Sequence, residues 1–198
     1  MKRKSNDIPI KKSTALFFDL VTGLSPEVHS KKRMLSDMKG MYSDKDAYEI
    51  MLDQQDSLIY EFYELGIPKT PHHLAYGTTI LYPGKVGNEY FMTKGHFHQK
   101  LATAEVYYCI KGHGMLLMEN PMGNVEIQKF SPGIAVYVPP NYAHRSINTS
   151  SSGPLISFFA FRADAGHDYK TIETKGFRKL IVEQDGKPKV IDNPNWNR

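Results

Sequence analysis

Short runs of β-branched and aromatic residues, separated by turns at regular intervals, dominate the hydrophobic pattern beyond residue 58. Runs of this length and composition, bounded by Gly, Pro and Asn, are typical of strands. They predict strands over 59–65, 75–82, 89–94, 104–111, 115–118, 125–130, 134–138, 145–148 and 155–161. The turns between them include Pro83-Gly84, Lys111-Gly112, Met122-Gly123 and Pro132-Gly133. Such a succession predicts an antiparallel sandwich or barrel.

Further elements are predicted outside a barrel core of about 57–163: a strand over 15–20, a helix over 47–52, and a hairpin over 177–183 and 189–191. Ser43, followed by acidic residues, is the expected N-cap of the helix. Asp185-Gly186 is typical of a hairpin turn. The predicted fold class is therefore all-β, with short N-terminal helical and strand additions.

Length and charge indicate one domain preceded by a basic tail. The chain has 198 residues, 40% of them hydrophobic, and no linker-like stretch divides it, which predicts a single domain over 13–198. The formal net charge of +4 is concentrated in residues 1–12, which carry five basic residues and one acidic residue. The rest of the chain is balanced, so we expect a solvated tail and no nucleic-acid partner.

Cysteine content and hydropathy favour a cytoplasmic protein without a membrane partner. Cys109 is the only cysteine, so no intramolecular disulfide can form, and its spacing from Glu105 and Tyr107 predicts a small buried filler. The apolar run at 15–18 is cut by Asp19 and is too short for a signal peptide. No segment has the ~20 apolar residues that a spanning helix needs.

Four residues have the chemistry of a metal site. His96 and His98 lie in T-K-G-H-F-H, and residues i and i+2 of a strand point to the same face. Glu105 begins the run A-E-V-Y-Y-C-I-K-G, a candidate neighbouring strand, and His144 follows far downstream. A single histidine is more often an ordinary polar residue, but imidazole and carboxylate together suit a divalent ion. The combination predicts metal ligation by all four.

The spacing around these ligands resembles the two motifs of the cupin superfamily, whose architecture is a jelly-roll β-barrel. The matching positions are Glu105 and Gly112 in the first motif, and Gly133, Pro139, Asn141, His144 and Asn148 in the second. Asn141 stands where the motif usually has glycine, and asparagine tolerates the left-handed conformation that such a turn needs. Six residues separate His98 from Glu105, which is more than most cupins have.

Nearly the whole chain resembles the cupin-type phosphoglucose isomerases of archaea and some bacteria. The segments that carry the resemblance are R-M-L-S-D-M, Y-P-G-K-V-G, T-K-G-H-F-H, A-E-V-Y, Y-V-P-P-N-Y-A-H-R, A-D-A-G-H-D-Y and D-N-P-N-W. The resemblance implies metal ligands at His96, His98, Glu105 and His144, substrate contacts at Tyr60, Thr79, Thr93, Gly95 and His167, and catalytic roles for Glu105, Tyr107 and His144. It also implies a homodimer and one divalent metal ion per chain, first of all Fe²⁺, although Mn²⁺, Ni²⁺ and Zn²⁺ suit the same ligands.

The implied substrate is a sugar phosphate, and the implied pocket residues suit it. Hydroxyls at Thr79 and Thr93 and the backbone N–H of Gly95 can bind a phosphate without a large charge. Lys94 is either a further donor or a surface residue. The family has a tyrosine where this chain has Phe161, so a phosphate contact is lost there, and Arg162 either compensates or points away.

The implied activity is a metal-dependent aldose–ketose isomerisation between glucose 6-phosphate and fructose 6-phosphate, in glycolysis and gluconeogenesis. Glu105 is the candidate to carry a proton between C1 and C2 through an enediol, and a direct hydride shift is the competing route. A sugar-phosphate binding module would share the barrel and the ligands. A cupin dioxygenase using iron and O₂ would share the ligands but would favour an apolar pocket.

Overall fold

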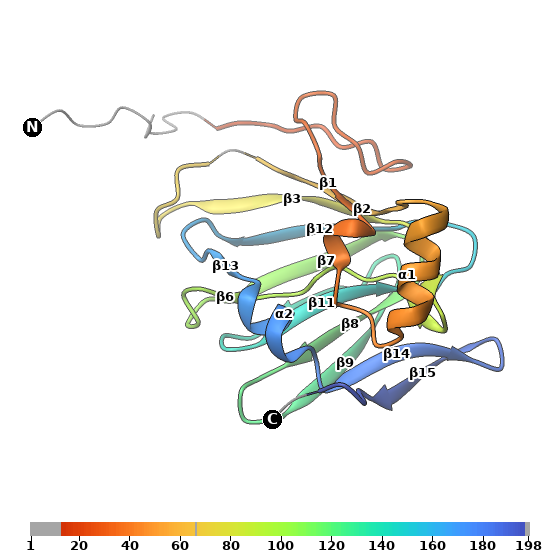
Figure 1. Cartoon of the computed structure of the whole chain (residues 1–198). Coiled ribbons are helices and arrows are strands. Elements are labelled where there is room, and N and C mark those ends of the chain that lie inside the picture. The colour runs from red at the N-terminus through yellow and green to blue at the C-terminus, as the bar shows by residue number, and fades with distance from the viewer. Residues whose placement is uncertain (1–12, 66, 197–198) are drawn as a thin grey trace, which may run out of the picture.

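The structure is a computed structural model that describes residues 13–65 and 67–196 (Figure 1). The basic tail predicted at 1–12 lies outside the described residues. Within the described ranges, no helix is long and apolar enough to cross a membrane.

A six-stranded antiparallel sheet forms one wall of the fold. Its strands, in spatial order, are β1 (Lys31–Met34), β2 (Leu58–Glu64), β3 (Leu74–Leu81), β12 (Leu155–Arg162), β7 (Glu105–Lys111) and β10 (Ala135–Val138). Strands far apart in the sequence are thus direct neighbours, as Figure 1 shows for β3, β12 and β7.

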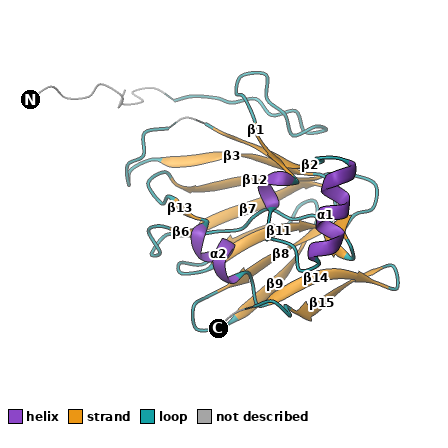
Figure 2. Cartoon of the chain, viewed as in Figure 1, coloured by secondary structure: helices purple, strands orange, loops and turns teal. Residues whose placement is uncertain are grey.

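Shorter sheets form the opposite wall. They comprise β11 (Ala143–Asn148), β8 (Gly114–Glu119) and β9 (Val125–Phe130); β13 (His167–Asp168) with β6 (Phe97–His98); and β15 (Lys187–Asp192), β14 (Lys179–Gln184), β5 (Glu89–Tyr90) and β4 (Lys85–Val86). The helical elements are a 3-10 turn (Ser36–Met38), α1 (Lys45–Gln54) and α2 (Lys170–Lys175), which lie outside the strand layers (Figure 2). This is the predicted all-β architecture, a cupin jelly roll with small helical additions.

Alternation along the strands separates the interior from the exterior. On β7, Glu105, Tyr107 and Cys109 are buried, whereas Val106 and Tyr108 are exposed. The period of two of an extended strand produces this pattern. Cys109 is completely buried, as expected for a core filler, and burial raises the pKa of its thiol to about 11.

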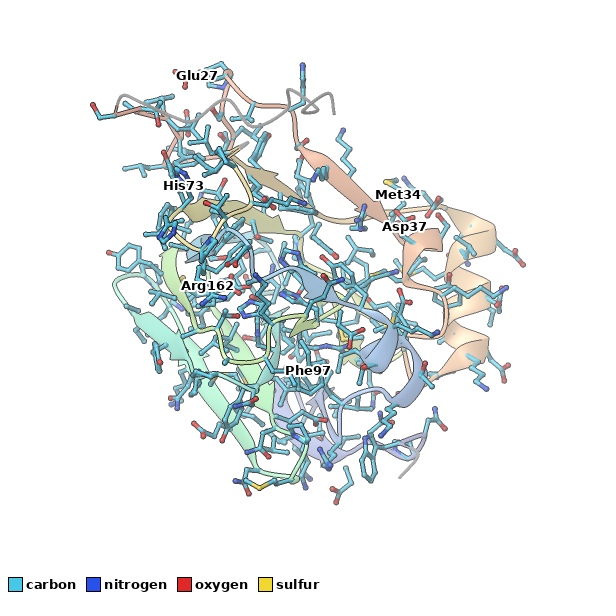
Figure 3. All side chains as sticks on the ribbon, turned by 90° about the vertical axis from the view of Figure 1, so that its left-hand side faces the viewer. Glu27, Met34, Asp37, His73, Phe97 and Arg162 are labelled. Carbon is cyan, nitrogen blue, oxygen red and sulfur yellow. The ribbon has the colours of Figure 1, made fainter. Side chains whose placement is uncertain are left out.

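The core lies between the two walls. Its largest fully buried side chains include Phe130, Phe177, Leu116, Ile147 and Leu155, which come from both layers. Phe97 likewise lies in the interior in the side-chain view, whereas Glu27 lies at the outer edge (Figure 3). Side chains from both walls therefore fill part of the barrel interior, and a cavity occupies the space that they leave free.

The predicted strand over 15–20 is wrong, because residues 13–30 form turns and irregular backbone. Asp19 Oδ1 accepts hydrogen bonds from the backbone N–H groups of Val21 and Thr22, which closes a turn. Gly23 then lies against the outer face of the large sheet, where Thr78 Oγ1 donates to its carbonyl at 2.7 Å. This segment therefore covers the sheet without joining it.

The N-cap of the helix and the end of one strand also differ from the prediction. The N-cap of α1 is Asp44, whose Oδ1 accepts from Ala47 N at 2.9 Å, because the Ser43 hydroxyl is engaged by buried Glu89, 46 residues away. The strand predicted over 89–94 ends at Tyr90, and the chain continues irregularly toward β6. The left-handed conformation expected at Asn141 is confirmed by its φ of 68°.

Candidate active site

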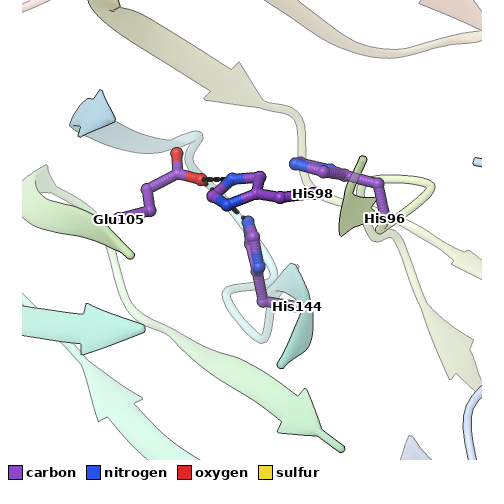
Figure 4. Close-up of side chains that lie close together, drawn as sticks. All are labelled: His96, His98, Glu105 and His144. Carbon is purple, nitrogen blue, oxygen red and sulfur yellow. Dashed lines mark hydrogen bonds and ion pairs between the residues drawn. The ribbon is translucent and has the colours of Figure 1, made fainter. Parts of the chain in front are cut away.

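Three histidines and one glutamate converge in the interior (Figure 4). His98 lies on β6, Glu105 is the first residue of β7, and His144 lies on β11. His96 pairs with His144 through a two-residue β-bridge, with N···O distances of 3.3 and 3.1 Å. All four side chains are buried, and one ligand atom from each lies within 4.8 Å of the others. The structure therefore brings together all four predicted metal ligands.

Hydrogen bonds orient the imidazoles toward the centre of this cluster. His98 Nδ1 is 2.7 Å from Thr103 Oγ1, and His144 Nδ1 is 3.4 Å from the carbonyl of Tyr142. The Nε2 atoms of these two rings consequently face Glu105 Oε2, at 3.1 Å for His98 and 3.0 Å for His144. Contacts of this kind hold a ligating ring in one tautomer and orientation. Thr103 was not predicted, because its role depends on a turn of the backbone.

Burial and neighbouring groups hold Glu105 and His96 in the protonation states that bind a metal ion. Burial alone would raise the pKa of the Glu105 carboxyl, but the imidazoles of His144 and His98 lower that pKa below its usual range. Burial, together with His144 and His167, lowers the pKa of His96 well below its usual value. The carboxylate is therefore ionised and His96 neutral at pH 7, as a metal ligand requires.

The donor set fits a divalent metal ion. His96 Nε2 and His144 Nε2 are buried and have no hydrogen-bond partner among the described residues; the approach of His144 to Glu105 is short but poorly aligned. Buried polar atoms are almost always satisfied, so two orphaned nitrogens beside an ionised carboxylate point to a cation.

A cavity of about 640 Å³ extends from the cluster across the inner face of the large sheet. The predicted residues that line it are Tyr60, Thr79, Thr93, Gly95, Tyr107 and His167, with His96, Glu105 and His144. Its volume is within the ordinary range for a small-molecule site. The cavity thus joins three of the four candidate metal ligands to every residue predicted to contact the substrate.

Gly95 is held where only glycine fits. Its φ is 76°, and a Cβ there would come within 2.7 Å of the Phe177 ring and 3.0 Å of the His144 carbonyl. Thr93, two residues earlier, is anchored to β11 because its N–H donates to the Ser146 carbonyl and its Oγ1 accepts from Ser146 N. The Thr93 hydroxyl proton remains able to donate into the cavity.

Two aromatic side chains beside the ligands stay neutral at pH 7. Burial lowers the pKa of His167 to about 4, and its ring centroid lies 4.3 Å from that of His96. Burial, followed by the neighbouring Glu105 carboxylate, raises the pKa of Tyr107 well above its ordinary value. Tyr107 therefore presents a phenolic O–H, a hydrogen-bond donor, next to the carboxylate.

The sequence left the roles of Arg162 and Lys94 open, and the structure decides both. Arg162 points away from the cavity, since it alternates with Phe161 on β12 and its Nε donates to Asp164 Oδ1 at 2.5 Å. Lys94 does not line the cavity: its side chain is partly buried, and its ammonium is 2.7 Å from Glu173 Oε1.

Several lining residues escaped prediction: Lys31, Arg33, Phe62, Ser146, Phe159 and Tyr169. Arg33 lies in R-M-L-S-D-M and Tyr169 in A-D-A-G-H-D-Y, two of the family segments, which was the available signal. Nothing in the local sequence indicated that either faces the cavity.

The protein is a cupin with a candidate metal site: its antiparallel barrel carries an inward-facing cluster of three histidines and one glutamate beside a polar cavity. The family described as glucose-6-phosphate isomerase (GPI) matches residues 32–197. The glucose-6-phosphate isomerase of Thermococcus kodakarensis is 47% identical, over 94% of this chain and 97% of that protein. That of Thermococcus litoralis is 47% identical, over 90% and 93%. The chain belongs to the glucose-6-phosphate isomerase family.

Among solved structures, an oxalate oxidase matches with a TM-score of 0.47 and 11% identity, over 58% of this chain and 56% of that one. That similarity is too distant to bear on function.

Proposed function

We propose that this protein interconverts glucose 6-phosphate and fructose 6-phosphate with the help of one divalent metal ion held by His96, His98, Glu105 and His144. One observation supports the proposal most strongly: in a chain of this family, the buried ligand cluster lies beside a cavity that is also lined by Thr79, Thr93 and Gly95, which can donate hydrogen bonds to a phosphate. Imidazole and carboxylate suit Fe²⁺, which we propose first, and also Mn²⁺, Ni²⁺ or Zn²⁺. When bound, such an ion supplies Lewis-acid polarisation of the sugar oxygens.

Glu105 is the candidate proton carrier between C1 and C2. Its carboxylate is ionised, buried and in contact with the cavity, so it can accept a proton from one carbon and return it to the next. The low basicity of this carboxylate opposes proton abstraction, and a hydride shift between the two carbons is the competing route. We favour proton transfer because the carboxylate and the cavity are contiguous.

Tyr107 and His144 support Glu105 in this proposal. The Tyr107 hydroxyl is protonated and can hydrogen-bond the carboxylate or a sugar oxygen that gains charge. His144 packs against the carboxylate, with its Nε2 3.0 Å from Oε2, and limits the positions that this oxygen can take. The rings of Phe159 and Phe161 line the cavity beside them and exclude water from the reacting carbons.

Thr79, Thr93 and Gly95 are proposed to hold the phosphate, with Tyr60 and His167 contacting the sugar. Thr79 and Gly95 come from opposite walls of the barrel, so a phosphate between them would receive hydrogen bonds from two sides. A free sugar would leave these donors unpaired and should be a poor substrate.

A coupled assay that detects glucose 6-phosphate formed from fructose 6-phosphate tests the proposed function. Turnover supports it. Binding of the sugar phosphate without turnover would indicate a binding module instead, and consumption of O₂ would indicate a dioxygenase.

We further propose a single domain over 13–198 that forms a homodimer in the cytoplasm. Val106, Tyr108 and Tyr137 form an exposed apolar group on the outer face of β7 and β10, suited to burial against a second copy. The cytoplasmic assignment follows from the substrate, because phosphorylated hexoses are too highly charged to cross a bilayer. Light scattering of the purified protein measures the oligomeric state.

A further inference from the structure

Two basic residues on the edge strand β1 face the same cavity as the candidate metal ligands. Lys31 pairs with Phe62 on β2, and Phe62 pairs with Thr79 on β3, so the three lie in one row across the sheet. Arg33 pairs with Tyr60 one row further along. Directly paired residues share a face of the sheet, and all five line the cavity. The inner face of the large sheet is therefore its floor.

The charged ends of both side chains lie over the same aromatic ring. Lys31 Nζ is 5.6 Å and the Arg33 guanidinium carbon 5.8 Å from the centroid of Phe62. Because Phe62 is the direct neighbour of Thr79, the two cations lie beside a proposed phosphate donor. Cations placed over an aromatic face are held there by its quadrupole, which keeps them in position before a ligand arrives.

Neither charge is neutralised within the part of the chain that the structure describes. Across residues 13–65 and 67–196, no carboxylate lies within ion-pair distance of Lys31 or Arg33, although Glu64 also lines the cavity. Arg33 Nη1 donates a hydrogen bond to the Lys32 carbonyl at 3.1 Å. By contrast, Lys100 at the same cavity is paired with Asp164. Lys31 and Arg33 thus keep donors for an anion.

We propose that Arg33, assisted by Lys31, binds the phosphate group of the sugar phosphate and makes the enzyme selective for a doubly charged anion at that position. This inference rests on the proposed function and adds to it the residues that recognise charge. The expectation that phosphate is bound without a large charge is thereby revised: the neutral donors position the group, and the two cations select its charge.

The arrangement also sets the orientation of the substrate. Glu105 lies on β7, and β12, β3 and β2 separate it from β1. At a strand spacing of about 4.8 Å, the β1 backbone lies about 19 Å from β7 along the sheet, and Thr79 lies halfway. The long side chains of Lys31 and Arg33 reach back over Phe62 toward Thr79. A phosphate bound there leaves C1 and C2 to extend toward Glu105.

Arginine suits this role better than lysine because its planar guanidinium can donate two parallel hydrogen bonds to one phosphate. Charge-assisted hydrogen bonds of this kind correspond to roughly 10-fold to 100-fold in affinity. We therefore expect Arg33 to contribute more than Lys31, which is the more exposed of the two.

The experiment measures binding of 6-phosphogluconate and of gluconate by calorimetry, with the KM and kcat for fructose 6-phosphate, in the metal-loaded protein. Arg33→Gln should weaken 6-phosphogluconate binding and raise KM by roughly 10-fold to 100-fold, with a smaller change in kcat and none in gluconate binding. It should also flatten the dependence of kcat/KM on ionic strength. Arg33→Lys should recover part of the loss, and Lys31→Gln should have a smaller effect.

Lys32→Gln is the matched control. Lys32 lies between the two residues on the same strand, is exposed, pairs with Glu61 and does not line the cavity, so this variant should behave as wild type. Unchanged 6-phosphogluconate binding in folded Arg33→Gln, or an equal loss in Lys32→Gln, would overturn the inference. Wild-type protein that binds 6-phosphogluconate through Arg33 but does not convert fructose 6-phosphate would instead overturn the proposed function alone.

Discussion

Replacing Glu105 with glutamine separates the two roles proposed for this side chain, metal ligand and proton carrier. Glu105 is 3% exposed, and one of its carboxylate oxygens, Oε2, contacts both His98 and His144. Glutamine has the same length and keeps one oxygen that can occupy this position. Its amide has no basic site for a proton from carbon. The substitution should therefore preserve the geometry of the cluster and remove its base.

The expected magnitude follows from what is lost and what remains. Three imidazoles and an amide oxygen remain as ligands, so the metal content should stay close to one ion per chain. Loss of a general base typically costs 10²–10⁴-fold, and the lower limit, about 10²-fold in kcat, raises the activation barrier by about 2.7 kcal/mol. The KM should change little, because Glu105 is not among the residues proposed to bind the phosphate.

The assay combines three measurements on wild type and Glu105→Gln: metal content by elemental analysis, kcat in the coupled assay, and solvent deuterium at C2 of recovered glucose 6-phosphate after wild-type turnover in D₂O. An enediol exchanges its proton with solvent, whereas a hydride shift does not. The proton-transfer argument is refuted if no deuterium enters and the metal-loaded glutamine variant stays nearly as fast as wild type.

Three further predictions follow from the site and the core. Chelation should abolish activity and a divalent ion restore it, while His144→Ala should lose metal yet keep the far-UV circular dichroism of the barrel; full activity of rigorously metal-free protein would contradict this. Thr93→Val should raise the KM for fructose 6-phosphate several-fold, and equal rates on free and phosphorylated fructose would disprove the phosphate assignment. Because burial raises the pKa of Cys109 to about 11, its thiolate population at pH 8 should be at least ~100-fold below that of the unfolded chain. Reaction with a chromogenic disulfide should be correspondingly slow until urea unfolds the protein, and rapid labelling of the native state would show that Cys109 is accessible.

Local pattern was sufficient for much of the fold and for the choice of candidate ligands. The period-two alternation of β7 predicted that Glu105, Tyr107 and Cys109 share the inner face, and the structure has all three buried. Turn chemistry predicted the hairpin at Asp185-Gly186, which has φ angles of 54° and 70°. These features depend on neighbours within a few residues, so they can be read along the chain. The ligand spacing and family segments likewise require no contact map.

Contacts between distant residues decided the rest. Ser43 does not cap the helix, because its hydroxyl donates to Glu89 instead. Residues 15–20 lie outside the sheet, because the turn that follows them places the Gly23 carbonyl against Thr78. In the sequence, nothing distinguishes Lys31 and Arg33 from other basic residues. The pairing of β1 with β2 is what directs both side chains toward the cavity.

Strand order cannot be read from the chain, because antiparallel neighbours are chosen by how whole faces pack, not by adjacent residues. A one-residue shift of β1 would turn Lys32 inward and both proposed phosphate-binding residues outward. The ligands of the candidate metal site were therefore recognisable in the sequence, whereas the charged end of the cavity exists only through the register of the sheet.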